Sequence, residues 1–204
     1  MQISADQNAE ICGKDLRKSA LISALICFYK MIFTDPLTNL KQFGLRPTDN
    51  VADLGAGSGA YTIPAAQMVR EGKVYAIEIQ KDLLLRIKDE ASKAFLSNVE
   101  TIWGDIELVG GTKLKDGIID AVIISSVLFQ AENKISLVQE ASRILKLDGR
   151  VLLIDWNNSF GGIGPRSDMI ISADAAKILF ENAGLKFEKE IHIDEYHYGL
   201  IFKK

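Results

Sequence analysis

A run of glycines directly behind an acidic residue carries the clearest chemical signal in this sequence. Residues 51–61 read VADLGAGSGAY, an apolar stretch followed by glycines at positions 55, 57 and 59. Glycine permits a positive φ and lets the backbone approach a ligand closely, and a helix that begins behind such a loop offers free N–H groups. The segment therefore predicts a buried strand, a ligand-binding loop and a helix. Its spacing also fits the dinucleotide fingerprint G-x-G-x-x-G/A, so it admits NAD, FAD or an adenosyl cofactor.

Asp53 distinguishes among these ligands because it lies two residues before the first glycine. A pyrophosphate is an anion that prefers the N-terminus of a helix, and a carboxylate in the same turn would repel it. An adenosyl sulfonium ligand carries a positive sulfur and an ammonium group, and a neighbouring carboxylate stabilises both charges. Asp53 therefore favours the sulfonium ligand over a dinucleotide.

The stretch DLGAGSG resembles motif I of the class I S-adenosylmethionine-dependent methyltransferases, in particular the broad group that acts on small molecules and quinone-like acceptors. The resemblance covers about residues 35–204. It implies S-adenosyl-L-methionine as the cofactor and S-adenosyl-L-homocysteine as the product. It also implies that the methionine half of the cofactor lies against the loop, which consists of Gly55, Ala56, Gly57, Ser58 and Gly59.

Two later strand ends stand where this family contacts the rest of its cofactor. Glu78 lies roughly 20 residues beyond the glycine loop, where a carboxylate can accept hydrogen bonds from both ribose hydroxyls, and Ile79 follows it. After the next strand come Gly104, Asp105 and Ile106. In the family a G-D or D-A pair at this place meets the adenine amino group through its carboxylate, and the resemblance implies that Ile106 stacks on the base.

Residues 120–130 read DAVIISSVLFQ and correspond to motif IV of the family, with Asp120 as a structural residue at the start of the strand. Ligands of open α/β sheets bind outside the carboxyl ends of the strands, so Ser125 and Ser126 are expected beside the methyl donor. The family often carries SNVLHH here, and the departure argues against a histidine base at this position. The chain also lacks NPPY and DPPY, which disfavours methylation of amide, guanine or adenine nitrogens.

Candidate catalytic residues follow the fifth strand and lie in the C-terminal hairpin. Asp155 and Asn157 precede a glycine-rich loop that resembles a substrate-side loop, and they can orient a nucleophile or remove its proton, with Trp156 as an aromatic surface. His197 is one of two histidines, and an imidazole that titrates near neutrality is a favoured general base. The site residues include no metal ligand set.

Short apolar strands that alternate with helices position these residues and indicate a parallel sheet covered on both faces. We expect a doubly wound, mostly parallel, seven-stranded α/β sheet with an antiparallel C-terminal hairpin strand. Residues 1–43 are expected to form an N-terminal helical extension or lid, and residues 44–204 the cofactor-binding domain. The expected strands are residues 51–54, 73–78, 99–103, 119–124, 151–154, 187–193 and 198–202, and the expected helices are about 16–33, 36–43, 59–70, 81–94, 134–145 and 172–183.

Length and charge restrict the classes of protein. The chain has 204 residues, which suits one sizeable α/β domain, and its formal net charge of -3 gives no long-range attraction to nucleic acid. Cys12 and Cys27 form no CxxC and have no nearby histidine, so a disulfide framework and a zinc site are both unsupported and a cytoplasmic location is expected. Residues 16–33 are apolar nearly all round but carry Lys30, and they are too short to span a membrane easily. This helix is expected to pack over the domain, with a membrane-surface or homo-oligomer contact as the alternatives.

Several functions remain open on the sequence alone. The leading hypothesis is a methyltransferase that transfers the methyl group in line to a small-molecule acceptor, and a protein-lysine methyltransferase is its nearest rival. A second class is a non-catalytic cofactor-binding module or partner subunit on the same fold. A third is an NAD-dependent oxidoreductase, which Asp53 and the expected terminal hairpin oppose.

Overall fold

The structure is a computed structural model, and it describes residues 35–159 and 164–204. The helix expected at about 16–33 lies outside these residues, as do the roles assigned to it as a lid, a membrane contact or an oligomer contact. Within the described residues, no helix is both long and apolar enough to cross a membrane.

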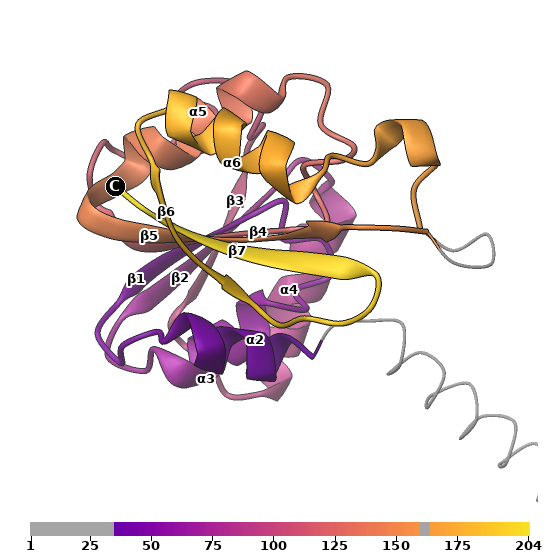
Figure 1. Cartoon of the computed structure of the whole chain (residues 1–204). Coiled ribbons are helices and arrows are strands. Elements are labelled where there is room, and N and C mark those ends of the chain that lie inside the picture. The colour runs from indigo at the N-terminus through magenta and orange to yellow at the C-terminus, as the bar shows by residue number, and fades with distance from the viewer. Residues whose placement is uncertain (1–34, 160–163) are drawn as a thin grey trace, which may run out of the picture. The chain divides into compact units, whose positions relative to one another are not determined.

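In the described part of the chain, seven strands form one sheet in the order β3-β2-β1-β4-β5-β7-β6 (Figure 1). The five strands from β3 to β5 are parallel, and β7 runs antiparallel between β5 and β6. This arrangement confirms the expected mostly parallel sheet and its C-terminal hairpin. The strands are β1 (Asn50–Leu54), β2 (Lys73–Glu78), β3 (Val99–Trp103), β4 (Ile119–Ser125), β5 (Leu145–Trp156), β6 (Lys186–Ile191) and β7 (His197–Lys203).

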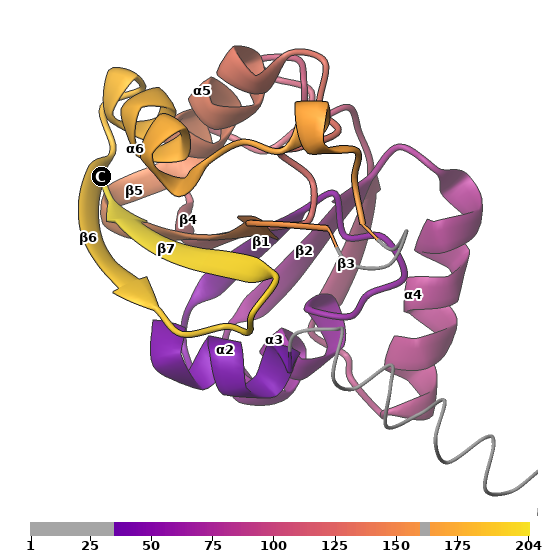
Figure 2. The ribbon, with the colours of Figure 1, turned by 45° about the vertical axis from the view of Figure 1, so that its right-hand side comes forward.

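Helices cover both faces of the sheet (Figures 1 and 2). One face carries α2 (Pro36–Phe43), α3 (Thr62–Met68) and α4 (Lys81–Lys93), and the other carries α5 (Lys134–Ile144) and α6 (Ala173–Asn182). A short 3₁₀ turn, η1 (Ser167–Met169), precedes α6. We refer to the two sides as the α2/α3 face and the α5/α6 face.

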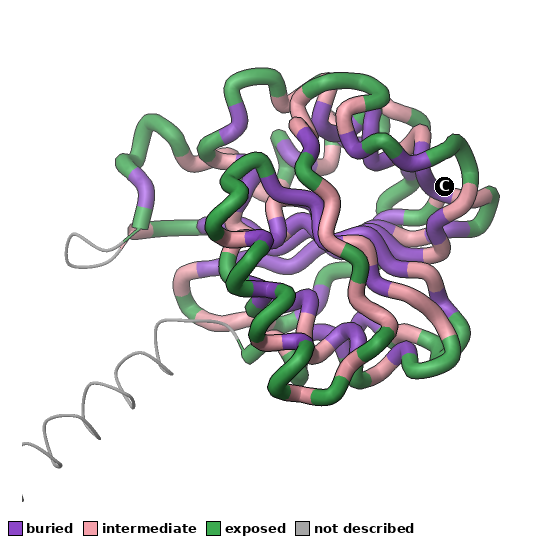
Figure 3. The backbone as a smooth tube through the Cα atoms, turned by 180° about the vertical axis from the view of Figure 1, so that it is seen from behind, coloured by how far each residue is buried: buried purple, intermediate pink, exposed green. Residues whose placement is uncertain are grey.

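The inner strands β1, β4 and β7, together with β2, are largely apolar because both of their faces are buried, whereas β3 and β6 at the two edges of the sheet are more exposed. In β5, Val151 and Leu153 belong to the core on the α5/α6 face, whereas Leu152 and Ile154 belong to the core on the α2/α3 face. Figure 3 shows the buried segments gathered along the strands and the exposed ones along the loops and outer helix faces. The alternation also fixes the face to which each side chain at a strand end belongs.

The observed elements differ from the expected ones in two informative places. β5 begins at Leu145 rather than at residue 151, because its pairing with β4 shifts from Ile119–Leu145 to Ala121–Arg150 and the residues between form an irregularity. The helix α2, grouped with the N-terminal extension from sequence, belongs to the compact unit that runs from Pro36 to Lys204. Its Leu40 and Phe43 are fully buried or nearly so in the core of the α2/α3 face, which ties α2 to the sheet.

Candidate functional site

The residues whose side chains could bind a ligand or take part in catalysis gather at one edge of the sheet. The carboxyl ends of the parallel strands lie there, and antiparallel β7 begins at the same edge, where His197 is paired with Trp156 of β5. Side chains along a strand point alternately to the two faces of the sheet. Five of these residues belong to the α2/α3 face, because each lies an even number of positions along its strand from a core residue of that face. They are Asp53, Glu78, Ser125, Trp156 and His197.

The glycine loop leaves β1 and is fastened to β2. The N–H groups of Gly55 and Ala56 both donate to the carbonyl oxygen of Ile77, at 2.9 Å and 3.0 Å. Gly55 has φ +73°, and a Cβ at this position would lie 2.7 Å from a methyl group of Val127. Gly55 is therefore required by packing against the segment that follows β4, a reason that the motif alone does not reveal.

Gly57 and Gly59 differ from Gly55 in what surrounds them. Gly57 has φ +54°, and a Cβ there would have only the carbonyl oxygen of Gly55 nearby, at 3.9 Å. The backbone at Gly57 is thus bare and open to a ligand. Gly59 is buried, and its missing Cβ leaves room for Ile87 of α4, while Ser58 between them is exposed.

Glu78 is bound directly to the glycine loop. One carboxylate oxygen accepts a hydrogen bond from the N–H of Gly57 at 3.0 Å. The other accepts from the N–H groups of Ile79 at 2.9 Å and Gln80 at 3.0 Å. Three backbone donors therefore hold the carboxylate in one orientation. Glu78 is buried, with 7% of its surface exposed. The glycine loop therefore adjoins the Glu78 carboxylate, which the resemblance places at the ribose hydroxyls of the cofactor.

Asp53 is the buried acid of the site. Its side chain is 2% exposed and accepts a hydrogen bond of 2.6 Å from the hydroxyl of Thr62, the first residue of α3. Burial raises its pKa to about 6, the Thr62 hydrogen bond opposes that rise, and the charge of Glu78 adds to it. Thr62 is a neighbour of the candidate site that sequence reasoning missed, since its only signal is a hydroxyl nine residues after the acid, at the start of a helix.

The loop after β3 contributes the expected adenine side. The N–H of Gly104 donates to the carbonyl oxygen of Glu78 at 3.3 Å, and the side chain of Ile106 lies 3.4 Å from the place where a Cβ on Gly55 would stand. Asp105 accepts a hydrogen bond from the N–H of Glu107 at 2.9 Å. The structure therefore brings this loop, Glu78 and the glycine loop together, as the sequence predicts. Ile79, also assigned to the cofactor, is 56% exposed beside them.

At the end of β4 the chain turns sharply. Ser126 has φ +55°, an uncommon conformation for a residue with a side chain, and its N–H donates to the carbonyl oxygen of Ile154 at 2.8 Å. This turn carries Val127 against Gly55, so the end of β4 packs on the glycine loop. Ser125 and Ser126 are both half-buried at this edge.

Asp155 lies on the other face of the sheet from His197. It is 1% exposed and accepts hydrogen bonds from the N–H groups of Phe129 at 3.1 Å and Trp156 at 2.7 Å. Burial raises its pKa to about 6, and these backbone donors oppose the rise. Its contacts hold the segment that follows β4. Asn157 is exposed, and its backbone N–H donates to the carbonyl oxygen of Tyr196 at 2.6 Å.

His197 forms a dyad that sequence reasoning did not predict. Its Nδ1 lies 2.9 Å and 3.0 Å from the two carboxylate oxygens of Asp194, and its ring lies 4.2 Å from that of Trp156, centroid to centroid. The backbone of Gly164 covers Trp156, because a Cβ there would lie 2.8 Å from the indole. A carboxylate on Nδ1 sets the tautomer and leaves Nε2 as the ring nitrogen that Asp194 does not bind. The His197 side chain is 2% exposed. The sequence signal was an acid three residues before the histidine in a turn.

The described residues fit an adenosyl sulfonium cofactor. The bare backbone at Gly57 is a cradle that a side chain would fill, and the fixed carboxylate of Glu78 adjoins it. A second carboxylate, that of Asp53, lies on the same face of the sheet. Oriented carboxylates suit hydroxyl donors and positive charge, whereas they would repel a pyrophosphate.

The mixed sheet with inserted β7 and the glycine loop bound to Glu78 together define a methyltransferase domain. Residues 45–189 match the family model for that domain, and the chain belongs to the methyltransferase domain family. A solved structure of an S-adenosylmethionine-dependent methyltransferase from Aquifex aeolicus superimposes with a TM-score of 0.75 at 26% identity, covering 83% of this chain and 89% of that one.

Curated relatives are enzymes that methylate carbon in small molecules, by their names. A ubiquinone/menaquinone biosynthesis C-methyltransferase from Teredinibacter turnerae is 29% identical over 116 residues, which are 56% of this chain and 45% of that protein. A probable cobalt-precorrin-6B C(15)-methyltransferase (decarboxylating) from Methanosarcina mazei is 31% identical over 114 residues, 52% of this chain and 62% of that protein. The chain spans about half the length of the curated relatives it matches.

Proposed function

We propose that this protein transfers the methyl group of S-adenosyl-L-methionine to a small-molecule acceptor. The observation that carries the proposal is the hydrogen bond between the N–H of Gly57 and the carboxylate of Glu78, in a domain of the methyltransferase family. That bond places the open backbone at Gly57 next to the Glu78 carboxylate, which can accept hydrogen bonds from ribose hydroxyls. The curated relatives support a small-molecule acceptor by their names. We also propose a cytoplasmic location, which the low number of cysteines supports.

In this proposal the cofactor lies along the strand ends from β1 to β3. The glycine loop and Asp53 hold the methionine half, and Glu78 with Ile79 holds the ribose. The adenine is held by the loop after β3, through Asp105 and Ile106. Ser125 and Ser126 border the methyl group at the end of β4.

The cofactor, when bound, supplies an already activated methyl group for in-line displacement, so the protein must align the acceptor, exclude water and, where needed, accept a proton. Trp156 and the His197 ring lie in contact on the same face as Asp53 and Glu78 and provide an aromatic surface for the acceptor. Charge disperses during the transfer, so an apolar surface of this kind is a suitable surrounding.

Among the three candidate catalytic residues, we assign proton removal to His197. Asp194 holds its Nδ1, and the ring lies on the α2/α3 face with the proposed cofactor residues. Asp155 faces the opposite side and binds backbone N–H groups, which supports a role in positioning the segment after β4. Asn157, exposed at the end of β5, is assigned to contact with the acceptor.

Calorimetry tests the cofactor assignment. We expect S-adenosyl-L-homocysteine to bind the protein with a dissociation constant in the micromolar range, and Glu78→Gln to weaken it about tenfold or more, because an amide accepts ribose hydrogen bonds less strongly than a carboxylate. Glu100→Gln, which alters an exposed carboxylate paired with Lys73, is the matched control and should bind normally. Absence of binding to the unaltered protein would refute the proposal.

A labelled methyl donor tests the class of acceptor. Incubation with cell extract should transfer label to an extractable small-molecule fraction in a reaction that the His197→Ala variant performs poorly. Label that enters protein would instead support the protein-lysine alternative. Cofactor binding without any transfer would support the non-catalytic module.

A further inference from the structure

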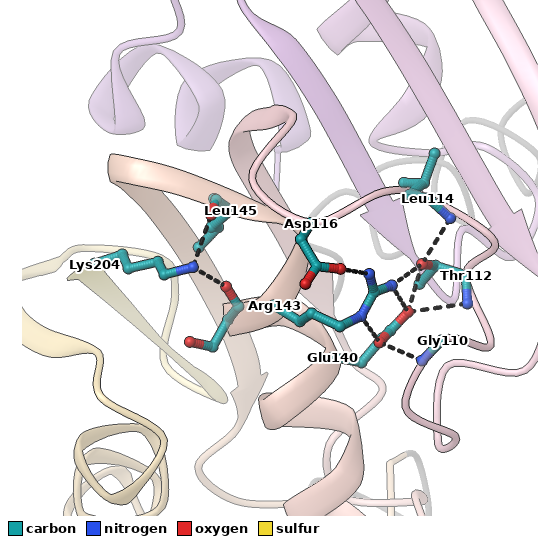
Figure 4. A network of polar contacts seen from close by, with 9 residues as sticks. Gly110, Thr112, Leu114, Asp116, Glu140, Arg143, Leu145 and Lys204 are labelled. Carbon is teal, nitrogen blue, oxygen red and sulfur yellow. Dashed lines mark hydrogen bonds and ion pairs between the residues drawn. The ribbon is translucent and has the colours of Figure 1, made fainter.

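Glu140 is a buried carboxylate that the proposed mechanism does not use. It lies on α5 with no exposed surface and accepts five hydrogen bonds (Figure 4). Two come from backbone N–H groups of the loop after β3, Gly110 at 2.7 Å and Thr112 at 3.1 Å. The others come from the Thr112 hydroxyl at 2.5 Å and from Arg143, at 2.8 Å and 2.7 Å.

The charge of Glu140 is secured by these contacts. Burial alone would raise its pKa, but the hydrogen bonds from Arg143, Thr112 and Gly110 outweigh burial and lower the pKa to about 2. Arg143 is held in turn by Asp116, at 2.5 Å, from the same loop. Glu140 is therefore an ionised anchor for the loop throughout the neutral range of pH.

The anchored backbone rests on the expected adenine-contacting residues. Gly111 lies between the two backbone groups that Glu140 holds, and a Cβ on Gly111 would lie 1.9 Å from the carbonyl oxygen of Asp105. Likewise, a Cβ on Gly104 would lie 2.5 Å from the carbonyl oxygen of Gly111. Backbone thus packs directly on backbone, with no side chain between to absorb a shift, so the position of Gly111 constrains Gly104 and Asp105.

A second contact joins the same loop to the region where α5 begins. The carboxylate of Glu107 accepts a hydrogen bond of 2.5 Å from the N–H of Asn133, the N-cap residue of α5. The loop is therefore attached to α5 at Glu107, next to the expected adenine-contacting residues, and again at Gly110 and Thr112. Neither attachment involves the glycine loop.

We propose that Glu140 is a positioning residue for the adenine side of the cofactor site, which it controls by holding residues 110–112 against α5. The proposal rests on the proposed function, in which Asp105 and Ile106 contact the adenine. Glu140 acts through Gly111 on Gly104 and Asp105 and touches no part of the cofactor itself.

Glu140→Gln tests the proposal because it keeps the shape of the side chain but removes its charge. It also replaces one carboxylate oxygen by an NH₂ group, which cannot accept the hydrogen bonds that this oxygen receives. We expect the dissociation constants of S-adenosyl-L-homocysteine and of 5′-methylthioadenosine to rise together, each about tenfold, because both ligands contain the adenine. Hydrogen exchange of peptides that span residues 104–114 should become faster. Should Glu140→Gln fail to fold, Thr112→Val decides the same question, because at nearly constant volume it removes the hydroxyl that donates to Glu140 and accepts from Arg143 and from the N–H of Leu114.

Asp120→Asn is the matched control. Asp120 also accepts a backbone N–H, from Asn50 at 2.9 Å, and binds Lys146 at 2.8 Å, but it lies at the start of β4, away from the site. This variant should lower stability without changing either affinity or the exchange of residues 104–114.

Three results would overturn the inference: unchanged affinities in a folded Glu140→Gln protein, unchanged exchange of residues 104–114, or an equal loss of affinity in Asp120→Asn. Asp105→Ala separates this failure from that of the proposed function. If Asp105→Ala weakens both ligands and Glu140→Gln does not, the positioning role is wrong. If Asp105→Ala leaves both affinities unchanged, the adenine assignment itself is wrong.

Discussion

At the scale of single residues, Asp53 and Asp155 have similarly raised pKa values on opposite faces of the sheet. Burial raises the pKa of each to about 6, yet Asp53 faces α3 and the glycine loop, whereas Asp155 faces the α5/α6 side. Their folded-state pKa values exceed the unfolded value, so the folded protein binds extra protons between about pH 4 and pH 6. Their burial therefore destabilises the fold increasingly as the pH rises through that window.

We predict that the affinity for S-adenosyl-L-methionine rises with pH up to about 6 and then levels, because the cofactor's positive charges favour ionised Asp53. The slope should approach about tenfold per pH unit below that point. Binding titrations between pH 5 and pH 7.5 measure it. Asp53→Asn should flatten the profile and Asp155→Asn should preserve it; a profile that depends on Asp155 would contradict the assignment.

At the scale of elements, the glycine loop combines two requirements that the motif does not separate. Gly55 is required by contact with the segment after β4, since a Cβ would lie 2.7 Å from Val127. Gly57 meets no such obstacle, and its N–H is bound by Glu78. One glycine therefore serves packing between elements, and the other keeps the backbone accessible.

We predict opposite outcomes for the two alanine variants. Gly55→Ala should lower the free energy of unfolding by about 2–4 kcal/mol, from overpacking and from the positive φ. Gly57→Ala should cost only about 1–2 kcal/mol, from the positive φ alone, yet weaken S-adenosyl-L-homocysteine severely. Urea unfolding and calorimetry measure both quantities. Val127→Ala should rescue part of the Gly55→Ala loss and none of the Gly57→Ala loss; equal stability losses would refute the distinction.

At the scale of the whole molecule, the sheet separates the proposed cofactor-binding and catalytic residues from the side chains that hold loops in place. Asp53, Glu78 and His197 belong to the α2/α3 face at the carboxyl edge, while Glu140 and Asp155 hold loops from the α5/α6 face. The site draws on β1, β2, β3, β4, β5 and β7, so ligand binding should stabilise the domain as a unit. Free energy of binding then adds to that of folding.

We predict that S-adenosyl-L-homocysteine at about 100 times its dissociation constant stabilises the protein by about 2.7 kcal/mol, which raises Tm by roughly 5–10 °C for a chain of this size. Calorimetric melting with and without ligand measures the shift. The Glu78→Gln protein should show a smaller shift at the same ligand concentration. A full shift in that variant would indicate that Glu78 does not bind the ligand.

Much of this architecture could be read from the sequence because its signals are local. The strands β2 and β3 were predicted with their observed bounds, since short runs rich in apolar residues end at turn residues. The glycine loop and Glu78 were both assigned to one cofactor from the resemblance to motif I and from the position of Glu78 at the end of a strand. The start of β5 was missed, because its first residues pair with β4 through an irregularity that depends on the partner strand.

What the sequence by itself determined is the order of elements, the fold class and the residues at the carboxyl ends of the strands, because glycine conformations and apolar runs are properties of neighbouring residues. Only the tertiary structure decided which face each of these residues occupies and what it touches. Strand register placed His197 beside Trp156 and Asp155 on the other face. Thr62 reached Asp53, and Glu140 reached a loop 28 and 30 residues away, only through packing of helices on the sheet. The Glu140 contacts join segments distant in sequence, and the Thr62 contact depends on how α3 packs on the sheet, so no local pattern encodes them.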